Sequence, residues 1–445
     1  MKIQLSDHFT YTKLLKFTLP SIVMMIFSSI YGVVDGFFVS NFAGKISFAA
    51  VNFIMPFLMI MTTVGFMFGT GGTALIAKTI GQGDKEKANR FFSLFTYVSF
   101  FLGVILAIFG IIFIRDIASF LGAKGELLEN CVTYAKIILI ALPFNILQLM
   151  FQSLFIAAEK PHLGLIVTLS SGITNMILDV ILVVFLPQKL KLIGAAIATG
   201  ISQIIGGSIP LFYFFKKNSS ILQLGKTRFE ISAITKACIN GSSEFMSNIS
   251  MNVVGMLYNI QLMKYAGENG VAAYGVMMYV SMIFASTFIG YSIGTSPIIG
   301  YHDGAKNYNE LKGLLKKSIR LIGIFGICMV IAGELLSFPL AKLFVGYDYQ
   351  LMELTVSGFR YFSLSFCFMG FAIFGSGFFT ALNDGITSAI ISFLRTLVFQ
   401  IAAVMILPLI IGIDGVWISI VVAEFMAMFL SAVFIFVKRK KYNYL

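Results

Sequence analysis

Two carboxyl side chains sit in stretches of the sequence that are otherwise strongly apolar. Asp35 and Asp179 both lie in such stretches, and Asn175 comes one helical turn before Asp179. A carboxylate in hydrocarbon is costly, so an ionisable residue there is by default a functional-site hypothesis. Carboxylate, amide and hydroxyl oxygens can bind Na⁺. Alternatively, two buried acids can share a proton, because burial and like charge favour the neutral form. A site for H⁺ or Na⁺ is therefore predicted.

The elements that must position these residues are predicted membrane-spanning helices. A span needs about 20 mostly apolar residues. Twelve stretches qualify, at about 14–40, 49–78, 92–115, 131–155, 164–186, 194–215, 233–262, 271–299, 314–338, 351–380, 386–411 and 413–437. Counted along each helix at about 1.5 Å per residue, five polar residues converge on the outer half of the first six spans. They are Asp35, Tyr134, Asn175, Asp179 and Thr199. The sequence leaves open that the two acids lie in water at the outer interface.

The composition sets the class of protein. Of the 445 residues, 58% are hydrophobic and only 12% are charged, and the mean hydropathy is +0.92. A soluble domain cannot bury so much apolar surface, and disordered, collagen-like and disulfide-rich classes are excluded as well. Strand-type alternation is absent, which argues against a β-barrel. The three histidines (His8, His162 and His302) are expected in polar connections. We therefore expect an all-α membrane protein without a metal cofactor or prosthetic group.

The basic residues predict the orientation in the membrane. The net charge is +12, and 22 of the 32 Lys and Arg residues fall in the two termini and in alternate connections, against 7 in the opposite connections. By the positive-inside rule, the basic set is cytoplasmic. Both termini are therefore expected inside, in a multi-pass protein of the cytoplasmic membrane. The charge is then a topology signal with some attraction to anionic lipid, and nucleic acid is not an expected partner.

The chain repeats at about half its length. Matching segments recur 221 to 224 residues apart, among them Gly83-Asp84-Lys85 with Gly304-Ala305-Lys306, and Gly194-Ala195-Ala196-Ile197 with Gly415-Val416-Trp417-Ile418. The repeat predicts two pseudo-symmetric six-helix bundles, at 1–215 and 231–445, joined by a cytoplasmic linker at 216–230. Chance recurrence of small residues in packed spans is the alternative.

Three further charges fall near mid-depth in the second half. Glu244, Arg395 and Glu424 could form a buried polar network, in which a structural role and substrate contact are both open. Pro20 lies 15 residues before Asp35 in the first span, where a proline removes a helical hydrogen bond and permits a hinge.

Several of these segments together resemble one family. They are Pro20…Asp35-Gly36, Gly81-Gln82-Gly83-Asp84, Asn175-x-x-x-Asp179, Gly194-Ala195-Ala196-Ile197-Ala198-Thr199, and Pro297-Ile298-Ile299-Gly300-Tyr301 with Gly304-Ala305-Lys306. Over essentially its whole length the chain resembles the multidrug and toxic compound extrusion (MATE) family, in its MepA-like, DinF-related branch.

The resemblance implies twelve helices in two lobes around a central cavity. It also implies export of amphiphilic, mostly cationic drugs across a bacterial cytoplasmic membrane by H⁺ or Na⁺ antiport. Four residues match the family's cation-site positions: Asp35, Asn175, Asp179 and Thr199. Tyr134 matches an aromatic hydroxyl close to that site, and Pro20 matches a proline whose bending has been proposed to couple to protonation.

Other classes of protein remain as alternatives. A flippase for lipid-linked oligosaccharide would also have two bundles, but its cavity would be expected to carry more Arg and Lys for pyrophosphate. An enzyme would need a nucleophile–base pair or metal ligands in the spans, and no HExxH motif is present. A channel would normally show a filter motif or an oligomeric ring. We therefore expect a monomeric transporter rather than an enzyme.

Overall fold

The computed structural model describes residues 3–444 and contains helices but no strand in that range. The α-helices are α1 (Tyr11–Phe38), α2 (Lys45–Gly81), α3 (Lys85–Phe120), α4 (Gly125–Ala157), α5 (Pro161–Asp179), α6 (Lys191–Phe215), α7 (Ile231–Gly304), α8 (Tyr308–Val345), α9 (Tyr349–Ser363), α10 (Phe366–Ala381), α11 (Gly385–Phe393), α12 (Gln400–Ile411) and α13 (Ile413–Tyr442). The all-α prediction is confirmed for this range.

The helices account for twelve membrane spans. Ten helical segments of the described chain are long and apolar enough to cross a bilayer, and α9 with α10 forms an eleventh that is bent by 48°. The 74 residues of α7 are far more than one span needs, which is about 20. Gly267 interrupts α7 with a left-handed backbone (φ 61°, ψ −151°), so that α7 supplies two spans.

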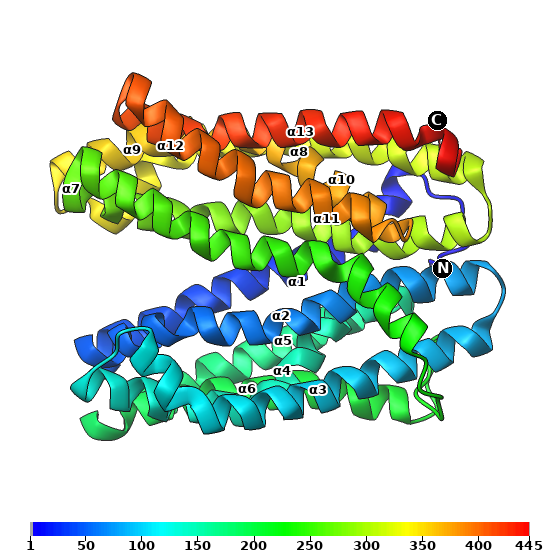
Figure 1. Ribbon diagram of the computed structural model, residues 1–445, viewed down its shortest axis with the longest axis horizontal. Helices are drawn as coiled ribbons and strands as arrows, with labels where there is room; N and C mark the ends of the chain where they lie inside the picture. The colour runs from blue at the N-terminus through cyan, green and yellow to red at the C-terminus, as the bar shows by residue number, and fades with distance from the viewer. Residues whose placement is uncertain (1–2, 445) are drawn as a thin grey trace.

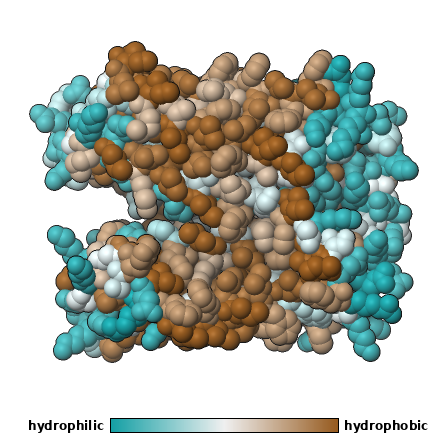
Figure 2. All heavy atoms as spheres, viewed as in Figure 1, coloured by the Kyte–Doolittle hydropathy of each residue, from teal (hydrophilic) through white to brown (hydrophobic). Residues whose placement is uncertain are grey.

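The spans form two bundles that lie side by side (Figure 1), with α1–α6 in one and α7–α13 in the other. Both chain termini lie at the same end of the molecule, which we call the termini end. Apolar side chains form a band across the middle of the surface, as expected of a membrane protein, and hydrophilic ones gather at the ends (Figure 2). At the end opposite the termini, the open end, Figure 2 shows a hollow between the bundles.

The first helix of each half also contacts the other half. The backbone of α1 at Ile22 lies so close to Gly290 of α7 that a Cβ there would come within 2.6 Å of the Ile22 Cα. Likewise, Gly241 in the first part of α7 packs on the backbone of Met67 in α2. Small residues permit such close helix contacts within membranes. The predicted bundle boundaries stay a prediction, but α1 and α7 each serve both bundles.

The first glycine of the repeated Gly-Ala-Ala-Ile and Gly-Val-Trp-Ile segments makes the same kind of close packing contact in both halves. Gly194 opens the packed part of α6 against the carbonyl of Leu182, and Gly415 opens that of α13 against the backbone of Leu407. A Cβ at either glycine would collide with the preceding segment of chain. Each glycine thus lets a span fold back tightly on the one before it.

The C-terminal end of α13 is fixed to the α10–α11 connection by one buried acid. Asp384 caps α11 and accepts hydrogen bonds from Lys438 Nζ (3.1 Å) and the Tyr442 hydroxyl (2.8 Å). Burial by itself favours the neutral acid, but these hydrogen bonds outweigh it and lower the pKa of Asp384. The interaction closes the second bundle at the termini end.

We expect Asp384→Asn to destabilise the detergent-purified protein by about 1–3 kcal/mol, because two donors lose a charged partner. A group with a lowered pKa stabilises the fold above its unfolded pKa, and this contribution is lost as the pH falls through the folded value. The difference in melting temperature from wild type should therefore be constant above about pH 5 and shrink below pH 3.8. Asp116→Asn, at an exposed acid of α3, is the control and should change neither the melting temperature nor its dependence on pH. A difference that persisted unchanged at pH 3 would contradict the interpretation.

Candidate functional site

The five predicted cation-site residues lie together in the open-end half of the first bundle. Asp35 is in the last turn of α1, and Asp179 is the last residue of α5 with Asn175 one turn before it. Thr199 and Tyr134 lie in the first part of α6 and α4, which both begin at the open end. Four helices thus converge at one depth, as the sequence predicts.

Hydrogen bonds connect three of these side chains. The Thr199 hydroxyl donates to Asp35 Oδ1 at 3.3 Å, and Asn175 Nδ2 donates to Thr199 Oγ1 at 3.4 Å. The Tyr134 hydroxyl also interacts with Thr199. Asp179 is fully enclosed (0% exposed), whereas Asp35 is partly exposed. The pair therefore extends from a partly accessible acid to one that is completely buried.

Three buried oxygens of this site lack hydrogen-bond donors among the described residues. Neither carboxylate oxygen of Asp179, nor Oδ1 of Asn175, accepts a hydrogen bond from the part of the chain that the structure describes. The ionisable group that acts on Asp179 is Asp35, another acceptor. Buried polar groups almost always have partners, and two facing acids repel each other when both are charged. The arrangement therefore suits a proton or a small cation between the two carboxyl groups.

A chain of buried polar groups that the sequence analysis did not identify continues from this site. Gln148 donates to the Ser171 hydroxyl (3.1 Å), Ser171 donates to the carbonyl of Ser202 (2.8 Å), and Ser202 donates to the carbonyl of Thr199 (2.8 Å). The spacing of Ser171, Asn175 and Asp179, four residues apart on one helix face, is the signal that could have revealed it. These contacts hold α4, α5 and α6 in register beside the two acids.

The backbone is irregular beside three of the intramembrane charges, Asp35, Asp179 and Arg395. The described chain has three π-helical segments, at Val39–Ala43, Val180–Val184 and Leu394–Phe399. The first begins four residues after Asp35, the second follows Asp179 directly, and the third contains Arg395. Such π turns widen the helix and occur frequently at functional sites.

The second-bundle network also forms, but its charges are divided unequally. Arg395 Nε donates to both carboxylate oxygens of Glu424, at 2.8 and 3.1 Å, and the Glu424 side chain is only 3% exposed. Glu244 is an electrostatic neighbour of Arg395, yet no cation of the described chain lies within ion-pair distance of its carboxylate. Arg395 and Glu424 thus neutralise each other, and Glu244 is the remaining acid.

Pro20 lies inside α1, directly before the Ser21–Ile22 backbone that packs on Gly290 of α7. The helix continues through the proline without interruption. Further along, the hydroxyls of Ser29 and Ser286 are 2.5 Å apart and join the same two helices. The proposed hinge position therefore lies within the part of α1 that packs on the second bundle.

Two details of the sequence require correction. His302 is not in an exposed connection, because it belongs to the last turn of α7 and is 1% exposed. The segment from Gly290 to Gly294 also has the spacing of the nucleophile motif G-x-S-x-G, a motif that would favour an enzyme. That motif places its serine on a strand-to-helix turn, whereas Ser292 lies inside a continuous helix. The glycines here serve helix packing, and the segment gives no reason to expect an enzyme.

Comparison with known proteins now decides the family. The MatE family model matches two segments, 20–181 and 245–406, which together cover most of the chain. The chain belongs to the MATE family. The second MATE segment begins 225 residues after the first, in agreement with the internal repeat.

Relatives and solved structures of the MATE family cover nearly the whole chain. The chain is 28% identical over 436 residues to the multidrug export protein MepA of Staphylococcus haemolyticus, covering 97% of this chain and 94% of the relative. It is 26% identical over 435 residues to MepA of Staphylococcus aureus, with the same coverage. A multidrug resistance MATE transporter solved in an outward-facing conformation superposes with a TM-score of 0.92 at 22% identity, covering 98% of each chain. The twelve-helix MATE fold is thus confirmed.

The Arg395–Glu424 pair gives a prediction for stability. Arg395→Met leaves a buried carboxylate without a partner and should destabilise the protein by about 3–5 kcal/mol. The double variant Arg395→Met/Glu424→Met removes both charges and should recover most of this loss. Melting temperatures of purified protein in one detergent measure both effects. A double variant no more stable than the single one would show that the two side chains do not compensate each other.

Proposed function

We propose that this MATE transporter exports amphiphilic, mostly cationic drugs in exchange for H⁺ or Na⁺. The observation that carries the proposal is the pair formed by Asp35 and Asp179, in which neither oxygen of the enclosed Asp179 has a hydrogen-bond donor among the described residues. A site of this kind is stable only when a proton or cation occupies it or when one acid stays neutral. The names of the MepA relatives support multidrug export as the activity, with drugs as the class of substrate.

The basic residues support an orientation with both termini in the cytoplasm of a bacterial cell. The connections that carry 22 of the 32 Lys and Arg residues belong to the termini end. The hollow at the open end would then face the outside of the cytoplasmic membrane. Asp35, the partly exposed acid, lies in that half of the molecule and is the first group that an entering cation would meet.

The mechanism follows from neutralisation of the pair. In the outward-open state, H⁺ or Na⁺ binds between Asp35 and Asp179 and lowers the negative charge of the pair by one. The hydrogen bond from Thr199 to Asp35 then has a less negative acceptor, and Thr199 in turn accepts from Asn175, so the packing of α1, α5 and α6 changes. A cationic drug binds less well to the less negative site and leaves. The coupling requires only that cation and drug bind the two states with different affinity.

Acidic side chains that have no basic ion-pair partner among the described residues favour cationic substrates. Asp35 and Glu244 are both partly buried, and no cation of the described chain pairs with either. A desolvated carboxylate attracts a cation more strongly than one in water, because the effective dielectric constant is lower. Aromatic side chains, which make up 15% of the sequence, can add cation–π contacts.

The flippase alternative is disfavoured by the same charge arrangement. A pyrophosphate headgroup would require free guanidinium or ammonium groups in the cavity. Arg395 is the basic residue best placed for this role in the second bundle, but its Nε is engaged by Glu424 at 2.8 Å. Binding of a polyprenyl pyrophosphate, together with absent drug transport, would favour the flippase.

Asp35→Asn and Asp179→Asn should each reduce ethidium efflux at least tenfold, since an amide cannot be neutralised by a proton and binds Na⁺ without charge compensation. The assay uses cells or proteoliposomes with equal amounts of inserted protein. Asp116→Asn, at an exposed acid of α3, is the matched control and should transport at the wild-type rate. Wild-type efflux by both site variants would contradict the mechanism.

The coupling ion is tested with the gradients applied one at a time. In proteoliposomes, a ΔpH and a Na⁺ gradient are imposed separately, and the one that drives ethidium movement identifies the ion. Asp179→Asn should abolish that drive, because it removes the enclosed member of the pair. Transport that proceeds equally well without either gradient would refute antiport while leaving multidrug export intact.

A further inference from the structure

The segment before α1 lies across the termini end and is firmly packed. We call residues 3–10 the N-terminal strap. Two of its three apolar side chains, Leu5 and Phe9, are 0% exposed, although they lie in a short stretch outside any helix. Phe9 packs edge-on against Phe17 of α1 (5.9 Å between ring centroids). The strap is therefore an ordered and packed part of the fold.

One end of the strap is bound to the first bundle. The backbone N–H of Leu5 donates to Glu159 Oε1 at 2.9 Å, directly after the end of α4. Leu5 also belongs to one apolar cluster with Ile156, in the last turn of α4, and with Leu311 of α8. This contact with the first bundle includes one hydrogen bond and one buried side chain.

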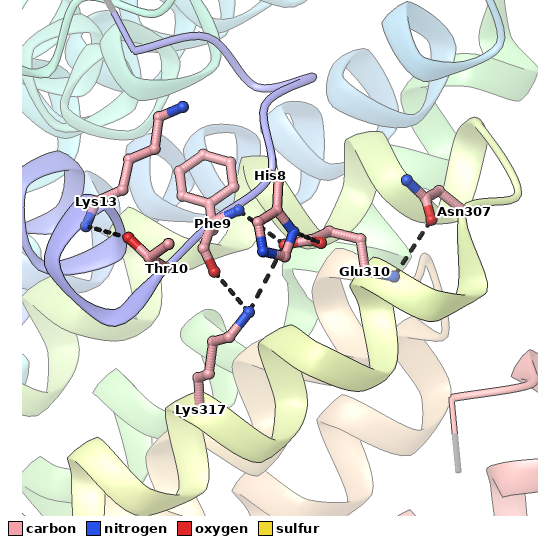
Figure 3. Close-up of polar contacts among 7 residues, drawn as sticks. All are labelled: His8, Phe9, Thr10, Lys13, Asn307, Glu310 and Lys317. Carbon is pink, nitrogen blue, oxygen red and sulfur yellow. Dashed lines mark hydrogen bonds and ion pairs between the residues drawn. The ribbon is translucent and has the colours of Figure 1, made fainter.

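The other end is bound to the second bundle by several charge-assisted hydrogen bonds around Glu310 of α8 (Figure 3). His8 Nδ1 lies 2.6 Å from Glu310 Oε2, and the N–H of Phe9 donates to Glu310 Oε1 at 2.9 Å. Lys317, two turns further along α8, donates to the carbonyl of Phe9 at 2.5 Å. Glu310 is only 7% exposed, so this carboxylate is largely shielded from water. Charge-assisted hydrogen bonds are the stronger kind.

The strap itself is stiffened where it enters α1. Asp7 accepts a hydrogen bond from the N–H of Gln4 (3.0 Å) and pairs with Lys13 (2.8 Å). Burial by itself would raise the pKa of Asp7, but these two contacts prevail and lower it. The strap therefore keeps its shape, so that a movement at its Glu159 contact is passed on to its Glu310 contact.

We propose that the N-terminal strap is a latch that holds the two bundles together at the termini end while the open end is hollow. Opening the termini end requires the end of α4 to move away from the start of α8. The strap contacts both and is eight residues long, so one contact must break. Release of the Leu5 contact would leave the strap on α8 together with the first half of α1.

The test measures the distance between the bundles at the termini end. Lys85→Cys (start of α3) and Lys312→Cys (α8) carry spin labels, in a background in which the native cysteines are replaced: Cys131, Cys238, Cys328 and Cys367. Pulsed electron–electron double resonance should show one dominant short distance between the two spin labels in the parent protein. Leu5→Ala and Glu310→Gln should each raise the ratio of long to short distances about tenfold, which corresponds to about 1.4 kcal/mol. Ser6→Ala, at an exposed strap residue, is the control and should match the parent.

Parent-like distances in monodisperse Leu5→Ala and Glu310→Gln proteins would overturn the proposal, and so would an equal shift in Ser6→Ala. His8→Ala gives the same test without a change in the core, because the His8 side chain is 72% exposed. It should produce a shift in the same direction, and no shift would count against the latch. The readout needs no transported substrate or ion gradient. The latch can therefore fail or hold independently of the proposed antiport.

Discussion

The rest of the structure depends on one electrostatic constraint, the enclosure of an acid that lacks hydrogen-bond donors beside a second acid. Asp179 is completely buried and its carboxylate oxygens have no donor among the described residues, and Asp35 is the acid that acts on it. Such a pair is unfavourable unless a positive charge or a proton lies between its members. The surrounding helices hold the pair in place through Thr199 and the hydrogen-bonded chain from Gln148. Occupancy of the pair therefore has a direct structural consequence for α1, α5 and α6.

Helix α1 is the element through which this local change can reach the other bundle. Its last turn carries Asp35, while its first half, from Leu14 to Ile22, is buried with the core of the second bundle. Pro20 lies within the part of α1 that packs on the second bundle, and further along the Ser29–Ser286 contact joins α1 to α7. The strap extends the same helix to Glu310 at the termini end. One continuous segment thus connects the cation pair, the bundle interface and the latch.

Much of the fold could be predicted from the sequence, because the membrane restricts the possible structures. Apolar length gave twelve spans, and the spacing of recurring glycines gave two related halves. The close contacts of Gly194 and Gly415 explain why that repeat persists in the sequence. The exchange of α1 and α7 between bundles could not be predicted, since hydropathy does not say which helices touch. The division at Gly267 was predicted only as a gap between spans.

The sequence by itself determined the class of protein, the depth of each charge, and the convergence of Asp35, Tyr134, Asn175, Asp179 and Thr199. Each of these follows from helix geometry along a known direction. Only the tertiary structure decided which charges are paired. It joined Arg395 to Glu424 and left Glu244 without an ion pair among the described residues. It also brought His8 to Glu310, which lies 302 residues away in the chain. Contacts between distant segments depend on how helices rotate and pack, and no local pattern in the sequence specifies that.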